Sequence, residues 1–184
     1  IKLEEIASYV ESARDASEVM EVEAHAARHY WQAIAQLTPP EYGFRGRSQD
    51  SPDPFNMMLN YGYGILRYVV EKALLIHGLD PYAGFLHADR SGKPSLTLDA
   101  MEPFRPIVDK ALLTSNIKPT VVNGYLSYDS RASVAKAVLG EMEAKAYRGA
   151  RLVKVSLILN SFIEDLASYL RDGSYLEPPI VRWG

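Results

Sequence analysis

The strongest constraint on the fold is a long amphipathic pattern in the middle of the chain, over residues 55–77. Asp53 and Pro54 precede it as a helix N-cap and a first-turn proline, and Gly78 follows it as a helix stop. Apolar residues recur along it at intervals of three and four, which is the spacing of one helix face. They are Phe55, Met58, Leu59, Gly62, Ile65, Leu66, Val69 and Ala73. The segment is therefore predicted to be the central helix of the protein.

Two glycines interrupt this predicted helix, Gly62 and Gly64. Each lowers the intrinsic stability of a helix by about 1 kcal/mol relative to alanine. Such a cost is understandable where another backbone or a ligand packs close to the helix, and of these two we favour close helix packing at both positions.

Further helical patterns predict an all-α fold, a single helical domain of about six helices. They cover residues 2–14, 16–36, 99–113, 130–147 and 151–171, with a bend expected at Pro106. β-Branched and aromatic residues around Asn123 and Gly124 predict a small β-hairpin near residues 118–128. A chain of 184 residues with 47% hydrophobic content is long enough to bury one such core.

Composition limits which functions the chain can have. It contains no cysteine, so any metal ion must be held by histidine, carboxylate or carbonyl groups. Its net charge of -3 gives no global attraction to nucleic acid, so a DNA partner would need a local basic patch. No apolar run approaches the roughly 18 residues of a membrane span, and no signal-peptide pattern opens the chain. We expect a soluble, cytoplasmic protein, and the start at Ile1 suggests a fragment of a longer chain.

The most chemically suggestive stretch is residues 84–109, which holds a histidine near turn residues and, among its four acidic residues, the closely spaced pair Asp99 and Glu102. His87 lies in a predicted loop, between Gly84 and the turn residues 91–94. Asp99 and Glu102 are three residues apart at a predicted helix start, so they should project to the same side. The spacing fits a shared metal site, but it equally fits a capping box that only satisfies backbone N–H groups.

A third carboxylate, Glu23, lies in the middle of an apolar stripe on the helix predicted over residues 16–36. It is therefore expected to face inward, where it would need a cation, a hydrogen bond or a metal ion. The helix alone does not decide among these. His25 and His29 fall on the opposite, polar face, which predicts a solvated pair and not a zinc site.

Four runs of sequence, taken together, resemble a known family. They are EAHAARHYW at 23–31, DPFNMMLNYGYGIL at 53–66, GLDPYAGFLH at 78–87 and PSLTLDAMEPFRPIVD at 94–109. In this order and spacing they are similar to Cas1, the CRISPR-associated integrase that forms the catalytic subunit of spacer acquisition. The similarity extends over nearly the whole chain.

The resemblance implies that residues 1–184 form the family's C-terminal helical metal-binding catalytic domain, and that its N-terminal β-rich domain is absent from this chain. It implies a metal-dependent DNA endonuclease and integrase of antiviral defence, which joins DNA 3′-OH ends to a CRISPR repeat by phosphoryl transfer. The implied metal ligands are Glu23, His87 and Glu102, with Asp99 as a further catalytic candidate one turn away. One imidazole with carboxylates suits Mn²⁺ or Mg²⁺.

The predicted DNA contacts are Arg45 and Arg47 on a loop after the second helix, and Arg90 and Lys93 beside His87. The implied partners are branched or double-stranded DNA (prespacer and repeat), the small ferredoxin-like adaptation protein Cas2, and a second copy of the full-length protein. Two alternatives stay open: a transposon-type integrase with the same catalytic domain, and a non-catalytic helical DNA-binding or scaffold module.

Overall fold

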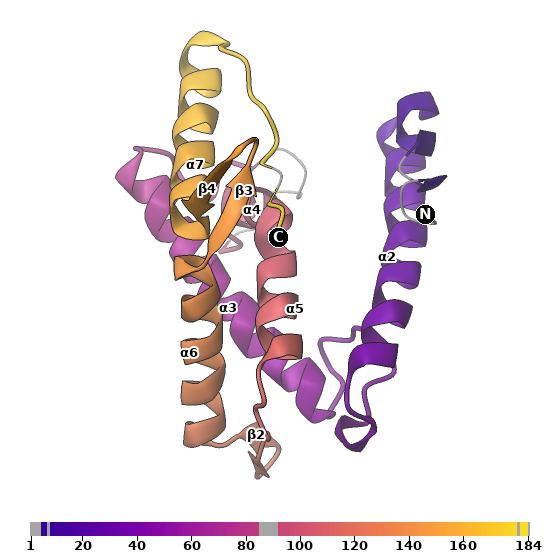
Figure 1. The fold of residues 1–184 in the computed structure, drawn as a ribbon. Coiled ribbons are helices and arrows are strands. Elements are labelled where there is room, and N and C mark those ends of the chain that lie inside the picture. The colour runs from indigo at the N-terminus through magenta and orange to yellow at the C-terminus, as the bar shows by residue number, and fades with distance from the viewer. Residues whose placement is uncertain (1–4, 7, 85–91, 180, 184) are drawn as a thin grey trace. The chain divides into compact units, whose positions relative to one another are not determined.

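The computed structural model of the chain describes residues 5–6, 8–84, 92–179 and 181–183. The chain divides into two compact units, Ile1–Met57 and Met58–Gly184. Both are built mainly from helices, and the second also carries two short hairpins (Figure 1), which confirms the predicted helical class. Within the described ranges, no helix combines the length and apolar character that a membrane crossing requires.

The first unit is organised around one long helix. It contains η1 (Tyr9–Ser12), α2 (Ala16–Leu37), η2 (Pro40–Tyr42) and the first turn of α3 (Pro54–Ile76). Asp15 caps α2, because its carboxylate accepts a hydrogen bond from the Glu18 N–H at 3.0 Å.

An aromatic cluster forms the core of the first unit. The ring of Phe44 lies 4.8 Å from that of Phe55 and 6.2 Å from that of Trp31, measured between centroids. Tyr42 stacks on Phe55 at 6.5 Å. The cluster therefore gathers around the C-terminal half of α2, close in sequence to the buried Ile34.

The loop between η2 and α3 is held by the buried side chain of Asn56. Its amide donates to the carbonyl of Gly46 at 2.9 Å and to the Asp53 carboxylate at 2.7 Å. Its carbonyl oxygen accepts from the Ser48 N–H at 2.9 Å and from Arg47 at 3.1 Å. Asp53 also accepts from the Asn56 N–H, which confirms it as the N-cap of α3.

The second unit packs five further elements with α3. They are α4 (Ser95–Met101), η3 (Glu102–Phe104), α5 (Arg105–Thr114), α6 (Tyr128–Glu143) and α7 (Val155–Asp172). Helix α5 packs against α6, and α6 and α7 follow each other nearly end to end (Figure 1). Their apolar faces meet in a core that includes Leu59, Leu66, Phe104, Ile107, Val108, Val134, Val138, Leu159 and Ile163.

The predicted hairpin is confirmed, and a second one was missed. Strands β1 (Val121–Val122) and β2 (Tyr125–Leu126) pair around Asn123 and Gly124, both with positive φ as their turn requires. Strands β3 (Lys145–Arg148) and β4 (Arg151–Lys154) pair where two helix ends were predicted.

The helical prediction for the second hairpin was wrong because its stabilising partners are distant in sequence. Within β3 only Ala146 is buried, and its three neighbours in the strand are exposed. The Tyr147 N–H donates to the carbonyl of Arg182 at 2.7 Å, so the C-terminal tail pairs with the free edge of the hairpin. The spacing of the basic residues at 145–154 resembles that of a helix face, and it does not indicate the pairing of Tyr147 with Arg182.

The close packing predicted at two glycines is present at only one of them. A Cβ atom on Gly62 would lie 2.6 Å from Cγ1 of Val108 and 3.4 Å from Cγ2 of Val138, so α3 meets α5 and α6 here without room for a methyl group. A Cβ atom on Gly64 would meet nothing within 4 Å.

The two glycines therefore make a matched pair of substitutions. Gly62→Ala is expected to lower the free energy of unfolding by about 1–3 kcal/mol, because overpacking outweighs the gain in helix propensity. Gly64→Ala is expected to raise it by up to about 1 kcal/mol. Urea denaturation of both variants measures the difference, and equal effects would contradict this account of the α3–α5 contact.

Candidate functional site

Glu102 begins the single turn η3, and its side chain is held by an arginine on the next turn. Nη1 of Arg105 donates to both carboxylate oxygens of Glu102, at 3.0 and 3.2 Å. The Glu102 side chain remains 38% exposed. Carboxylate oxygens have further lone pairs beyond those that accept from arginine, so Glu102 is fixed in orientation and still open to a ligand.

Arg105 belongs to a longer network in the second unit. Its guanidinium lies 4.6 Å above the centre of the Tyr63 ring, and the Tyr63 hydroxyl donates to the buried carboxylate of Asp109. Burial works to lower the pKa of Arg105, but Glu102 and Tyr63 raise it, and the net pKa lies above the usual arginine value. The network Glu102–Arg105–Tyr63–Asp109 thus keeps a permanent positive charge beside the candidate ligand.

Asp99 does not cap a helix, so the capping-box alternative is wrong. It is the fifth residue of α4, whose N-cap position is occupied by Pro94. Its side chain is 5% exposed and therefore less accessible to an incoming ion than that of Glu102, one turn later. The helix starts earlier than predicted because Ser95, just after Pro94, is engaged with the preceding loop.

Ser95 fastens the segment that leads toward His87. Its hydroxyl accepts from the Gly84 N–H at 2.9 Å and donates to the carbonyl of Tyr82 at 2.5 Å. The Thr97 N–H donates to the carbonyl of Pro81 at 3.2 Å. Residues 81–84 are therefore docked on the first turn of α4.

Two predicted site residues, His87 and Arg90, lie outside the described residues. Lys93, the other predicted phosphate contact of this stretch, is exposed after the turn at Gly92. Among the residues that the structure does describe, no group of three or more histidine and acidic side chains is arranged to hold a metal ion. The ligand set that includes His87 thus remains a prediction. Its donors, one nitrogen and carboxylate oxygens such as those of the accessible Glu102, fit Mn²⁺ or Mg²⁺.

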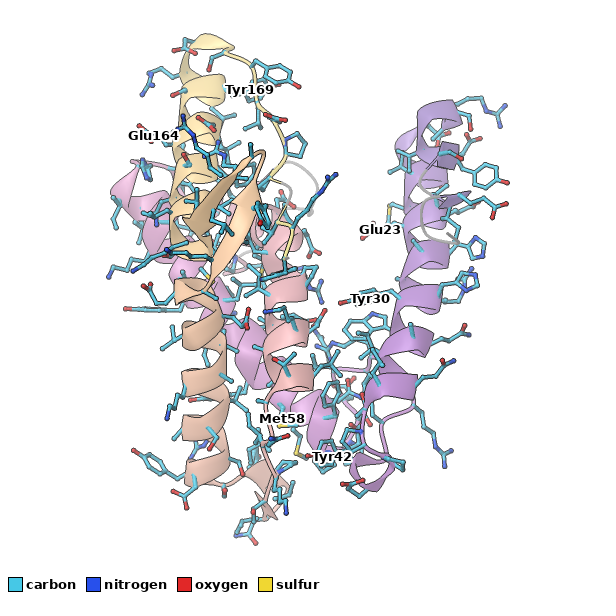
Figure 2. The ribbon with its side chains drawn as sticks, viewed as in Figure 1. Glu23, Tyr30, Tyr42, Met58, Glu164 and Tyr169 are labelled. Atoms are coloured by element: carbon cyan, nitrogen blue, oxygen red, sulfur yellow. The ribbon has the colours of Figure 1, made fainter. Side chains whose placement is uncertain are left out.

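Within the described residues of the first unit, no core covers Glu23. Glu23 and Tyr30 project from the same side of α2 (Figure 2), as the apolar stripe predicted, but Glu23 is exposed. Ile34 is only 6% exposed, whereas Val19 at the other end of the stripe is 40% exposed. The first unit covers only the C-terminal end of this stripe, since its aromatic cluster gathers there. The metal-ligand role of Glu23 stays a prediction.

The two loop arginines of the first unit differ in what they contact. Arg45 is exposed. Arg47 is half-buried and donates to the Ser48 carbonyl at 2.9 Å and to Asn56 at 3.1 Å. Arg45 is thus the freer candidate for a phosphate contact, and Arg47 also supports the loop.

Alanine substitutions should separate these roles. Arg45→Ala is expected to reduce the salt dependence of DNA binding by about one log unit per log unit of salt, with unfolding free energy unchanged within about 0.5 kcal/mol. Arg47→Ala is expected to lower the free energy of unfolding by about 1–3 kcal/mol through the lost hydrogen bonds. Salt-series binding and denaturant melts measure both, and an unchanged salt slope for Arg45→Ala would move the DNA path elsewhere.

The sequence did not point to Tyr63, Asp109 or Asn56. Tyr63 and Asp109 are 46 positions apart, so only the packing of α3 on α5 brings them together. The Glu102–Arg105 pair did carry a signal, since an acid and a base three residues apart on a helix are neighbours.

Comparison with known proteins agrees with the resemblance. Residues 1–138 match the family model described as CRISPR associated protein Cas1. The chain is 50% identical over 133 residues to CRISPR-associated endonuclease Cas1 2 of Pyrobaculum aerophilum, covering 72% of this chain and 44% of that protein. It is 43% identical over 169 residues to CRISPR-associated endonuclease Cas1 of Hyperthermus butylicus, covering 89% of this chain and 50% of that protein. The chain thus spans about half the length of the curated relatives it matches.

Two solved structures share the fold. A casposase bound to its integration product superposes with a TM-score of 0.86 at 25% identity, covering 98% of this chain and 58% of that one. A CAS1 protein from Thermotoga maritima superposes with a TM-score of 0.81 at 22% identity, covering 93% of this chain and 57% of that one, and shows the fold alone.

Proposed function

The chain belongs to the Cas1 family of CRISPR-associated proteins, and from that premise we propose that it is the catalytic part of a divalent-metal-dependent DNA endonuclease and integrase. The proposed reaction is phosphoryl transfer, which joins DNA 3′-OH ends to a CRISPR repeat or cleaves DNA with water. The observation that carries the proposal is the 50% identity to a Cas1 endonuclease over 72% of this chain.

The proposed ligands are Glu23, His87 and Glu102, with Asp99 as an alternative to Glu102. Mn²⁺ or Mg²⁺ bound there would polarise a phosphate oxygen and activate the attacking water or 3′-OH. Glu102 supplies oxygen donors whose direction is set by the two hydrogen bonds from Arg105.

The charges of Arg45 and Lys93 are proposed to neutralise DNA phosphates, because both side chains are exposed. Arg47 and Arg90 are proposed as further contacts. DNA is the proposed partner, and the similarity to a casposase bound to an integration product supports this proposal. Association with Cas2 and dimerisation of the full-length protein are proposed on family membership.

A strand-transfer assay tests the function. Branched DNA with a free 3′-OH is incubated with the protein and Mn²⁺, and a chelator is added in parallel. Joined or cleaved product is expected with Mn²⁺ and none with chelator. A full-length protein that yields no product with either Mn²⁺ or Mg²⁺ would contradict the proposal.

The casposase superposition, with a TM-score of 0.86, favours one second candidate, a transposon-type integrase. Strand-transfer assays with different acceptor DNAs distinguish the two functions. A CRISPR repeat should be a better acceptor than unrelated duplex DNA if the protein serves spacer acquisition, whereas a transposon-type integrase should show no preference for the repeat.

A further inference from the structure

Helix α2 carries a pair of histidines whose ring nitrogens nearly touch. His25 and His29 are one turn apart on the same face, and their Nε2 atoms are 3.1 Å apart. Their ring centroids are 4.9 Å apart with the planes tilted by 52°. His25 is exposed and His29 is partly exposed, as predicted for a solvated pair, so both nitrogens can be reached from solvent.

The spacing of the two nitrogens matches the bite of a single metal ion. Zn–N bonds of 2.0–2.1 Å at a tetrahedral angle place two ligand nitrogens about 3.3 Å apart. At the right angle of a square-planar Cu²⁺ site, similar bonds place them about 2.9 Å apart. The observed 3.1 Å lies between these values, so the distance between the two nitrogens fits a chelate.

We propose that His25 and His29 form a chelating site for a borderline transition-metal ion, Cu²⁺ or Zn²⁺, separate from the proposed catalytic ligands. In the metal-free pair one Nε2–H donates to the other Nε2. In the chelate that proton moves through solvent to Nδ1 of the same ring, so both Nε2 lone pairs face the metal and no net proton is released. Neither other described histidines nor described acids complete a three-ligand cluster around the pair.

The expected consequence is local stabilisation of α2. A metal that bridges two successive turns binds the folded helix better than the unfolded chain, so it stabilises the helix by mass action. The polar helix face predicted a solvated pair and not a zinc site, but it gave no information on the nitrogen spacing, which favours a chelate at the surface. The proposal does not depend on the nuclease function, because it uses neither Glu23 nor Glu102.

Titration with Cu²⁺ tests the site, since Cu²⁺ has the highest affinity of the first-row divalent ions for nitrogen ligands. The chain has four histidines, which provide two matched pairs. The His77→Ala/His87→Ala variant, which lacks the histidine of the proposed catalytic site, should bind one Cu²⁺ with electron paramagnetic resonance couplings to two nitrogens, and the ion should raise its melting temperature. The wild type should bind this ion in addition to any Cu²⁺ held at His87. When His25→Ala/His29→Ala is added to the His77→Ala/His87→Ala variant, the affinity should fall roughly tenfold or more, the loss expected even for an outer-shell partner of a metal ligand.

Circular dichroism of each variant without metal checks that α2 remains helical. Because both side chains lie at the surface, the helix is expected to be retained. A His77→Ala/His87→Ala spectrum with fewer than two nitrogen couplings would overturn the proposal, and so would unchanged Cu²⁺ affinity when His25→Ala/His29→Ala is added to that variant. Zn²⁺ should compete with Cu²⁺ in the wild type, and Mg²⁺ should not.

Discussion

Replacing Glu102 by glutamine is expected to abolish Mn²⁺-dependent DNA cleavage and strand transfer. The substitution keeps the size of the side chain and removes the charge that a metal ligand needs. It also removes the ion pair with Arg105, but that pair is partly exposed and such pairs stabilise by about 0–1 kcal/mol. Activity should therefore disappear while the protein stays folded, which strand-transfer assays, calorimetric Mn²⁺ titration and thermal melts can measure together.

Matched substitutions distinguish a ligand from a structural acid. Glu23→Gln and His87→Ala should also abolish activity and weaken Mn²⁺ binding. Glu21→Gln should leave both intact, because Glu21 projects about 200° away from Glu23 around α2. Asp99→Asn should have an intermediate effect. If Glu102→Gln left Mn²⁺ affinity unchanged, Glu102 would be structural and Asp99 would replace it as the third ligand.

Replacing Gly84 by alanine is expected to reduce activity by about 100-fold, the cost of displacing a catalytic group by about 1 Å. A Cβ atom here would lie 2.5 Å from Cβ and 2.7 Å from the backbone carbon of Ser95. The backbone of α4 cannot yield as a flexible side chain would, so the loop before His87 must move. The hydrogen bonds that Ser95 makes to Tyr82 and Gly84 would be lost with it.

The control for this prediction is Gly140→Ala, since a Cβ atom at Gly140 in α6 would meet nothing within 4 Å. That variant should keep wild-type activity and gain up to about 1 kcal/mol of stability. Single-turnover strand transfer compares the two. Wild-type activity in Gly84→Ala would show that the docking of residues 81–84 does not position the chemistry.

Features specified by neighbouring residues were predictable from the sequence. The caps Asp15 and Asp53, the stop at Gly78 and the turn at Asn123 each depend on contacts within a few positions, and all are present. The restart of the helix at Pro106 is present as well, since η3 ends where α5 begins.

Features that depend on distant partners were not predictable. Glu23 is exposed. An apolar stripe on one helix shows which side chains share a face, but it does not specify which other residues cover that face. The edge of the β3–β4 hairpin pairs with the tail at Arg182, and the guanidinium of Arg105 beside Glu102 lies over the ring of Tyr63 on another helix. The family resemblance supplied the candidate ligands, whereas hydrogen bonding in the structure supplied the role of Arg105.

The hydrogen bonds of Asn56 have a consequence for the entropy of DNA binding. Ordering a flexible loop costs about 1–2 kcal/mol of backbone entropy per residue. Asn56 already fixes the backbone at Gly46 and Ser48, on either side of Arg47. The loop backbone is therefore already ordered when the protein folds. Binding of a DNA phosphate to Arg45 should then cost little more than the conformational entropy of that one side chain, about 0.5–1.5 kcal/mol. The loop is preorganised, and an Asn56→Ala variant should lose affinity for DNA mainly through a less favourable binding entropy.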